Sequence, residues 1–179
     1  MGLRKALAYS KKNARPFTRN SRRKNKSYIK TVPFSKIVKF NGGDLKGYNE
    51  KKHTHEVILK SEEWVQIRDN ALEACRMLIT KQMDTKALGQ YYLEVKAHPH
   101  HFLRENKSAA AVAGADRIST GMTQSFGVVV GRAAIVPAQK TIFFVSCANE
   151  KAARVARDAL LMTGPKLACK SRVIFTKVR

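Results

Sequence analysis

The sequence has few acidic residues and none of the cysteine patterns that hold a metal ion or a disulfide framework. Its 179 residues include 13 Asp and Glu against 35 Lys and Arg, a formal net charge of +22. The three cysteines, Cys75, Cys147 and Cys169, are far apart and form no CxxC pair, which argues against structural zinc and against disulfides. Because their neighbours are apolar, we expect them to be small core residues in a reducing compartment.

The sequence also lacks any run of about 18 apolar residues, the length that a helix needs to cross a bilayer, so we expect no membrane partner. It contains no P-loop, nucleophile elbow or dinucleotide fingerprint. His55-Glu56 is not followed by the second histidine of a HExxH motif, and His53 and His55 have no cysteine nearby. We therefore expect no catalytic residue, no bound metal and no cofactor.

One group of histidines and acids keeps an enzyme alternative open. A metal-dependent nuclease could use such groups to hold a cation and activate water. The spacing matches no zincin pattern, however, and histidines beside Pro99 are more often packing or RNA-stacking groups, which is the interpretation we favour. The group consists of His98, His100, His101, Glu105 and Asp116.

The positive charge is concentrated at the N-terminal end. Residues 1–40 hold 13 Lys and Arg and no acid, so the other residues carry the remaining +9. A chain with this excess repels itself, and a polyanionic partner is the natural interpretation. Residues 1–32 have too few apolar side chains for a core, which predicts an extended basic arm, and we expect residues 1–30 to be disordered in the free protein.

Aromatic residues stand between the basic clusters of this arm. Cations can follow a phosphate backbone while Tyr9, Phe17 and Tyr28 stack on bases, so we expect a long RNA contact. The alternatives are a disordered solvated tail and a nuclear-import signal. The cations expected to bind rRNA here are Arg4, Lys5, Lys11, Lys12, Arg15, Arg19, Arg22, Arg23, Lys24 and Lys26.

Beyond Pro33, short runs rich in β-branched and aromatic residues predict strands. The first is followed by the turn-forming Asn41-Gly42-Gly43-Asp44. The fourth and fifth are separated only by Pro137-Ala138-Gln139-Lys140, so we expect these two to form a hairpin. The expected strands are 37–40, 55–60, 91–97, 128–136, 141–147 and 172–177.

Two segments carry apolar residues at helical spacing. Ser61 is a favourable N-cap with acids after it, so we expect one helix from there to about Met83. The other should begin near Asn149 and end at Gly164-Pro165. The apolar faces are expected to be Trp64, Ile67, Ala71, Ala74, Cys75 and Leu78 in the first helix, and Ala152, Val155, Ala156, Ala159, Leu160 and Thr163 in the second.

These elements together predict an α+β fold. We expect a two-layer sandwich, in which two helices pack on a mostly antiparallel sheet, with an extended N-terminal arm and a long internal loop. The globular domain should span residues 33–179, and the loop about 99–127. A structureless loop of this length is uncommon in a compact domain unless it is functional or disordered. Its middle is rich in Ala, Gly and Ser, so a short surface helix is the alternative.

The residues of this loop resemble the signature of a known family, the universal sixteenth protein of the large ribosomal subunit, which is counted as the tenth in the archaeal and eukaryotic naming. Further stretches agree in the right order along nearly the whole chain, and their style is closer to archaeal members. The loop matches are His100-His101-x-Leu103-Arg104-Glu105-Asn106-Lys107, Ala113-Gly114-Ala115-Asp116-Arg117, Gly121-Met122, Phe126-Gly127 and Gly131. The other matches are Arg15-Pro16-Phe17-Thr18-Arg19, Tyr28-Ile29, Val32-Pro33, Lys36-Ile37 and Val65-Gln66-Ile67-Arg68-x-Asn70-Ala71-Leu72-Glu73-Ala74.

The resemblance implies a non-enzymatic protein of the cytoplasmic ribosome. It implies contacts with large-subunit rRNA between the central protuberance and the stalk base, near the 5S rRNA and among neighbouring ribosomal proteins, without homo-oligomers. Lys36 and Arg132 are expected to join the arm in binding rRNA. The loop is expected to approach the peptidyl-transferase centre and tRNA through Arg104, Lys107, Gly114, Asp116, Arg117 and Gly121.

The sequence departs from the family pattern in three places. Residues 20–26 look like extra basic length, Thr123-Gln124 stand where an Arg is usual, and Val128-Val129 replace Lys-Pro. We expect one or two rRNA contacts to be lost or moved as a result. Charge alone leaves a chromatin-like architectural protein that binds DNA as the non-enzymatic alternative, and a preference for folded rRNA over duplex DNA would separate the two.

Overall fold

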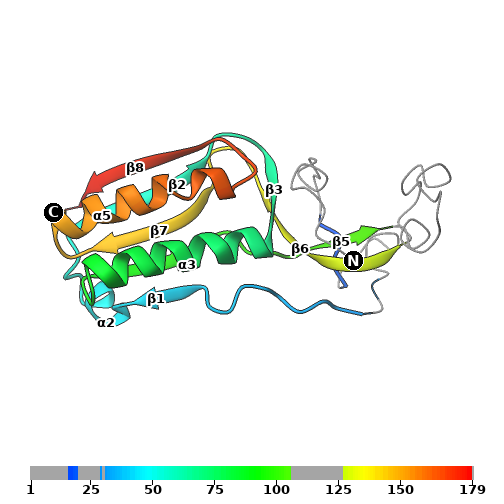
Figure 1. The fold of residues 1–179 in the computed structure, drawn as a ribbon, viewed down its shortest axis with the longest axis horizontal. Helices are drawn as coiled ribbons and strands as arrows, with labels where there is room; N and C mark the ends of the chain where they lie inside the picture. Colours follow the sequence, from blue (N-terminus) through cyan, green and yellow to red (C-terminus); the bar gives the residue numbers. More distant parts are fainter. Residues whose placement is uncertain (1–15, 20–28, 30, 106–126, 179) are drawn as a thin grey trace.

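The computed structural model describes residues 16–19, 29, 31–105 and 127–178. The sequence-based expectations for the rest of the basic arm and for most of the internal loop fall outside these residues. Within them, the elements form two antiparallel sheets and the helices that accompany them, so the α+β prediction is confirmed. Figure 1 shows the larger sheet and its helices at one end and the smaller sheet projecting from the other.

The larger sheet has five strands in the order β1-β4-β7-β2-β8, each antiparallel to its neighbours. Alternate residues of β2 are buried, as expected for a strand with one face toward a core. The central strand, β7, is buried along most of its length and includes Phe143, one of the largest fully buried side chains. The strands are β1 Asn41–Gly43, β4 Tyr91–Val95, β7 Thr141–Cys147, β2 His55–Ser61 and β8 Ser171–Lys177.

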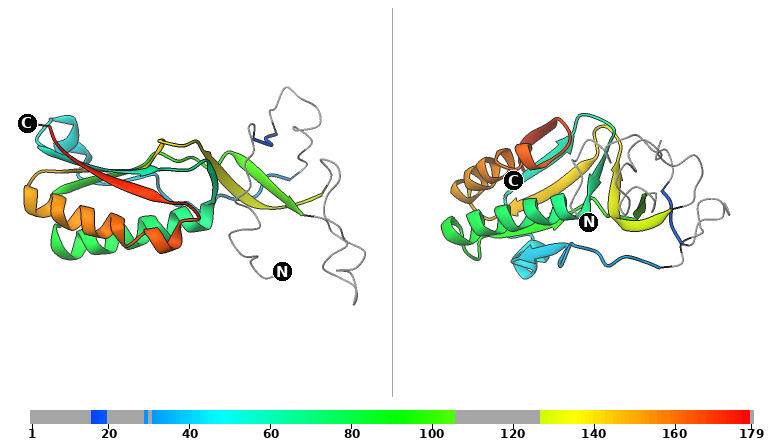
Figure 2. Two further views of the ribbon diagram at one scale, coloured as in Figure 1. Left: turned by 90° about the horizontal axis from the view of Figure 1, so that it is seen from above. Right: turned by 45° about the vertical axis from the view of Figure 1, so that its right-hand side comes forward.

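Helices α3 (Asp69–Lys86) and α5 (Glu150–Leu161) lie side by side against one face of this sheet (Figure 1 and the left view of Figure 2). Helix α5 packs closely because its inner face is mostly alanine, including Ala152, Ala156 and Ala159. The expected second helix is therefore confirmed. The short helix α2 (Leu45–Asn49) follows β1, and a 3₁₀ turn, η3 (Gly164–Lys166), follows α5.

The smaller sheet has three strands in the order β3-β6-β5 and projects from the main body (left view of Figure 2). Its central strand β6 (Val128–Val136) pairs with β3 (Val65–Arg68) at its C-terminal half and with β5 (His101–Glu105) at its N-terminal half. Buried residues of β3 and β6 belong to the same hydrophobic core as those of the larger sheet. The smaller sheet is thus rooted in the main core, and its outer part extends beyond it.

The expected helix from Ser61 is wrong at its start. Ser61 ends β2, Val65–Arg68 form strand β3, and the helix begins only at Asp69. Pairing of β3 with β6 overrides the local helical spacing, because propensity is weak beside a tertiary contact. The helix therefore buries a different face from the expected one, namely Asp69, Leu72, Cys75, Ile79 and Met83.

The expected hairpin is also wrong. Strands 128–136 and 141–147 have the predicted bounds, but β6 belongs to the smaller sheet and β7 to the larger one. Across the turn, Gln139 N–H donates to Ser61 O at 2.7 Å, and Ser61 N–H donates to Lys140 O at 3.0 Å. The turn is held by the end of β2, so the two strands that it joins separate into different sheets.

Two smaller expectations need correction. The strand expected at 37–40 lies later, at Asn41–Gly43, where the chain pairs with β4. The expected loop of 99–127 begins with a strand, since His101–Glu105 form β5. The strands expected at 55–60, 91–97 and 172–177 are confirmed within two residues at each end.

No helix in the described ranges is both long and apolar enough to cross a membrane.

Candidate nucleic-acid interface

Two arginines of the smaller sheet each lie over a phenylalanine ring. Phe102 and Arg104 are two residues apart on β5, and the register with β6 shifts between Leu103 and Arg104. Arg132 of β6 is the cross-strand partner of Phe102, and its guanidinium carbon lies 5.4 Å from the centre of that ring. The Arg104 guanidinium carbon lies 4.1 Å from the centre of the Phe17 ring. We call Phe17, Phe102, Arg104 and Arg132 the arginine–aromatic cluster.

The segment 16–19 is fixed along the edge of β5. Phe102 N–H donates to Phe17 O at 2.9 Å, and Phe17 N–H donates to His101 Nδ1 at 2.8 Å. Since Nδ1 accepts this bond, a neutral His101 carries its proton on Nε2. This part of the basic arm is therefore attached to the smaller sheet through its backbone, and the attachment places Phe17 over Arg104.

A second segment, residues 31–38, contacts both Arg132 of the smaller sheet and the start of α3. Arg132 Nε donates to Pro33 O at 2.8 Å, and Lys36 N–H donates to Asp69 Oδ2 at 3.0 Å. Ile37 is 5% exposed and belongs to the core. We call residues 31–38 the strap, because these contacts tie it from the smaller sheet to the start of α3.

The cluster holds its cations in a partly desolvated setting. Burial lowers the pKa of Arg104 from its ordinary value, although an arginine stays charged at neutral pH. Among the described residues no group accepts a hydrogen bond from Arg104 Nε or Nη2, and the Phe17 ring is the contact that compensates. Such a guanidinium is oriented before any anion arrives.

The residues expected to bind rRNA or to lie in the loop divide into three groups. Arg104 and Arg132 are half-buried in the cluster, whereas Arg19 and Lys36 are exposed beside it on segments 16–19 and 31–38. The structure therefore brings Arg104, which was expected in a loop, together with residues expected to bind rRNA. The remaining expected residues lie outside the described ranges: Arg4, Lys5, Lys11, Lys12, Arg15, Arg22, Arg23, Lys24, Lys26, Lys107, Gly114, Asp116, Arg117 and Gly121.

The histidines near β5 pack against rings. His98 stacks on Phe40 with ring centres 4.6 Å apart, and on His100 at 5.8 Å. The pKa of His98 is lowered, first by burial and then by the neighbouring His100 and Lys140. In the part of the chain that the structure describes, no three His, Cys, Asp or Glu side chains are grouped as metal ligands would be. These contacts agree with the prediction that the histidines beside Pro99 are packing or RNA-stacking groups.

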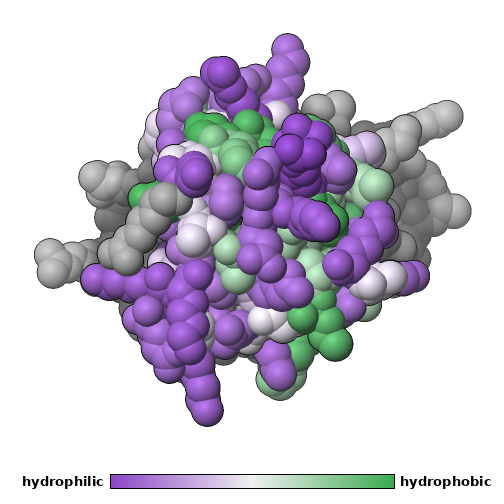
Figure 3. Space-filling view, turned by 90° about the vertical axis from the view of Figure 1, so that its left-hand side faces the viewer, coloured by the Kyte–Doolittle hydropathy of each residue, from purple (hydrophilic) through white to green (hydrophobic). Residues whose placement is uncertain are grey.

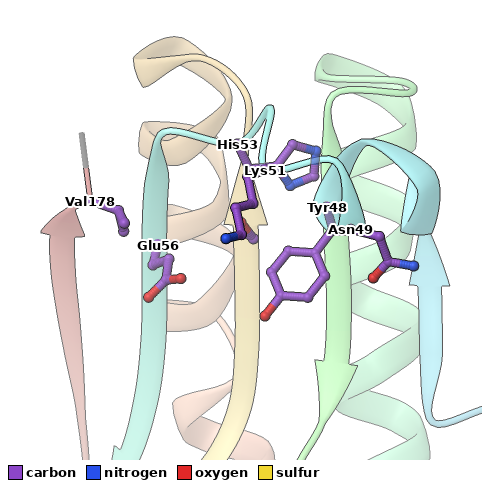
Figure 4. A pocket seen from close by; sticks show the side chains of 7 residues that line it. Tyr48, Asn49, Lys51, His53, Glu56 and Val178 are labelled. Atoms are coloured by element: carbon purple, nitrogen blue, oxygen red, sulfur yellow. The ribbon is translucent and has the colours of Figure 1, made fainter.

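A pocket lies at the other end of the molecule. It measures about 460 Å³ and is lined by residues of α2, β2 and β7 and of the segments after α2 and β8. Figure 4 shows the Lys51 amine pointing between Tyr48 and Glu56. Ser146 and His53 also line it, and within the described residues His53 Nδ1 has no hydrogen-bond partner. In Figure 3, this end shows mostly hydrophilic residues with separate hydrophobic patches.

Sequence reasoning missed Phe102 and the fixed position of Phe17. The spacing Phe102-x-Arg104 was the available signal, because residues two apart share a face of a strand. The pairing of Phe102 with Arg132 could not be read from the sequence, since it requires the register of β5 against β6.

Comparison with known proteins gives a consistent match. The family model described as ribosomal protein L16p/L10e matches residues 16–174. The large ribosomal subunit protein uL16 of Methanosphaerula palustris is 40% identical over 154 residues, 86% of each chain. The protein of the same name from Staphylothermus marinus is 37% identical over 180 residues, which cover 100% of this chain and 97% of its own.

Proposed function

Because this chain belongs to the L16p/L10e family of ribosomal proteins, we propose that it binds large-subunit rRNA through the smaller sheet and the segments attached to it. The family is structural, so the chain is a non-enzymatic protein of the ribosome. The relatives carry the name of a large-subunit protein, which supports the same subunit here. A cytoplasmic location follows from that role.

The arginine–aromatic cluster is the observation that carries this proposal. Guanidinium groups stacked on rings can pair with phosphates in the plane of the fork, while the rings limit their movement. Arg19 and Lys36 are exposed on the adjoining segments. Half-buried arginines of the cluster and exposed cations therefore lie at the same end of the molecule. RNA offers the regular row of phosphates that such an array would neutralise.

We further propose that the segment following β5 extends this interface toward tRNA and the peptidyl-transferase centre. The proposal rests on β5, which ends at Glu105 and directs the chain away from the main body (Figure 1). The residues of the proposed extension are those expected from the resemblance, Lys107, Gly114, Asp116, Arg117 and Gly121. Contacts near the central protuberance, the stalk base and the 5S rRNA belong to the same proposal.

The first test is sedimentation of a native cell extract through sucrose at low and then at high salt, with detection of this chain. We expect it to travel with large subunits and to resist moderate salt. Migration at the top of the gradient, or with DNA, would contradict the proposal and reopen the architectural alternative.

A binding measurement tests the cluster itself. Arg132→Ala should weaken binding to purified large-subunit rRNA and reduce the slope of log affinity against log salt by about 1, since one phosphate contact is lost. Arg157→Ala is the matched control, because the Arg157 side chain is exposed on α5, and it should leave the slope unchanged. Equal slopes for both variants would remove the cluster from the interface, as would equal affinity for duplex DNA and rRNA in the wild type.

The loop proposal has its own test. The double variant Arg104→Ala with Arg117→Ala should slow elongation more than it lowers the yield of large subunits, because its cations are proposed to face tRNA. Ribosome profiles give the yield, and a translation assay with purified ribosomes gives the rate. Normal elongation by ribosomes that contain the variant would contradict this placement.

A further inference from the structure

Phe34 lies almost wholly in solvent on a backbone that is fixed on both sides. Its side chain is 94% exposed, the highest value among the large apolar residues described. One residue before it, Pro33 O accepts from Arg132 Nε at 2.8 Å, and two residues after it, Lys36 N–H donates to Asp69 Oδ2 at 3.0 Å. Ile37 then enters the core at 5% exposure. The ring is therefore held out from an anchored strap and does not belong to a loose chain end.

Stability gives no reason for this position. Single apolar residues on a surface are ordinary, but most keep part of their area against the protein. Phe34 adds almost no packing to the fold, because nearly all of its area faces water. The strap is anchored by the backbone groups of its neighbours and by the Ile37 side chain, and none of these contacts needs an aromatic residue at position 34.

Cations stand close to Phe34 in the sequence, and residues 31–40 contain no acid. Lys36 and Lys39 are exposed two and five residues after Phe34, and Arg132 donates to the carbonyl of the preceding residue. An exposed ring with cations one to five residues away is the arrangement that single-stranded RNA sites use, in which a base stacks on the ring and its phosphates meet the cations.

We propose that Phe34 is a stacking platform for an unpaired base of the large-subunit rRNA, with Arg132 and Lys36 oriented toward the flanking phosphates. This inference rests on the proposed function, because it requires rRNA at this end of the molecule. It adds a contact that neither charge nor the arginine–aromatic cluster supplies, one made through the face of a base. A hydrophobic pocket on a neighbouring protein is the competing occupant.

Substitutions at position 34 separate stacking from simple apolar contact. Loss of one base–aromatic stack weakens binding by about 5- to 150-fold, so Phe34→Ala should weaken binding to purified large-subunit rRNA within that range. Phe34→Leu should be nearly as weak because leucine offers no ring, whereas Phe34→Tyr and Phe34→Trp should bind like the wild type. The slope of log affinity against log salt should not change, since no phosphate contact is removed.

A fluorescence measurement reports on the contact directly. The chain has one tryptophan, Trp64, so Phe34→Trp combined with Trp64→Phe places the only indole at position 34. We expect rRNA to quench this indole strongly, because stacked bases quench it. Val38→Trp in the same Trp64→Phe background is the matched control, because Val38 is 75% exposed on the same strap, and its indole should be quenched much less.

The outcomes distinguish this inference from the proposed function. If the wild type binds rRNA but Phe34→Ala or Phe34→Leu binds equally well, stacking is excluded and the proposed function stands. Equal quenching at positions 34 and 38 would also overturn the inference. If the wild type neither binds rRNA nor sediments with large subunits, the proposed function fails and this inference fails with it.

Discussion

At the scale of single residues, burial controls the ionisation of the three cysteines. Cys75 and Cys147 are fully buried, and burial raises the pKa of each thiol to about 12. Cys169 is half-buried, and its pKa is also raised, mainly by burial. The expectation that the cysteines are small core residues is confirmed for Cys75 and Cys147, and all three are free thiols in the structure.

Thiol reactivity should follow this order. At pH 8, we expect iodoacetamide to modify Cys169 before Cys75 and Cys147, because the thiolate is the reactive form and burial suppresses it. Peptide mapping by mass spectrometry after timed labelling would measure the order. Modification of Cys75 as fast as Cys169 in the folded chain would show that the core opens more readily than its packing implies.

The same thiols make stability depend on alkaline pH. Their folded pKa is raised from 9.0 to about 12, so the unfolded chain loses these protons first as the pH rises. Their contribution to the free energy of unfolding is complete below about pH 9 and is lost between about pH 9 and 12. Urea unfolding at pH 8 and at pH 10.5 should show this fall, and Cys75→Ala with Cys147→Ala should reduce it. An equal fall in both proteins would assign it to other groups, such as Tyr91.

At the scale of elements, the start of α3 and the turn after β6 set the positions of the strap and of the two sheets. Asp69 is 5% exposed, accepts from Lys36 N–H at 3.0 Å and from Asn70 N–H at 2.8 Å, and lies where the helix dipole favours an acid. Gln139 has a φ of 65°, a conformation that side chains other than glycine adopt at a cost. One carboxylate and one strained turn thus determine where these segments go.

Asp69→Asn should lower the free energy of unfolding by about 1.5–3 kcal/mol, because the amide keeps only one of the two buried acceptor oxygens and loses the charge. Asp158→Asn is the control, since that carboxylate is exposed and pairs with the exposed Arg157, and it should cost less than about 1 kcal/mol. Urea denaturation gives both values. Similar small losses for the two variants would mean that the strap is not held by Asp69.

Gln139→Gly should raise the free energy of unfolding or leave it unchanged, because relief of the left-handed conformation, about 1–2 kcal/mol, offsets the added flexibility of glycine. The hydrogen bond from residue 139 N–H to Ser61 O is kept in this variant. Gln139→Val should destabilise the protein, since a β-branched residue fits this conformation poorly. A higher melting temperature for the valine variant than for the glycine variant would contradict the argument.

At the scale of the whole molecule, the two sheets share one core. Val65 and Ile67 of β3 and Val136 of β6 pack in the same cluster as Val57 and Phe143 of the larger sheet. The outer half of β6 leaves that cluster, and Val130 is 42% exposed there. The described chain should therefore unfold as one cooperative unit, while the projecting end contributes little to its stability.

Ile67→Ala should cost about 2–5 kcal/mol, because Ile67 is 1% exposed and leaves a cavity where the two sheets meet. Val130→Ala, on the projecting end, should cost less than about 1 kcal/mol. In Ile67→Ala, the backbone amides of β2 and β3 should lose protection from hydrogen exchange equally. Two separate unfolding transitions, with only β3 affected, would show that the sheets do not share a core.

The sequence by itself determined the features that depend on local pattern and on composition. Alternating and β-branched runs predicted strands 55–60, 128–136 and 141–147, and alanines at helical spacing predicted α5, because these periods follow from backbone geometry. The charge pointed to a polyanionic partner, and the residues of the loop pointed to the family, which the comparisons confirm.

The tertiary structure alone decided which strands pair. Residues Val65–Arg68 became a strand and not a helical turn because β6 offered free backbone groups to pair with, and the predicted hairpin separated because β2 holds its turn. The contacts of Phe17 with Arg104 and of Phe102 with Arg132 depend on the same pairings. Pairings of this kind join residues far apart in sequence, and no local spacing encodes their register, so this part of the interface emerges only when the chain folds.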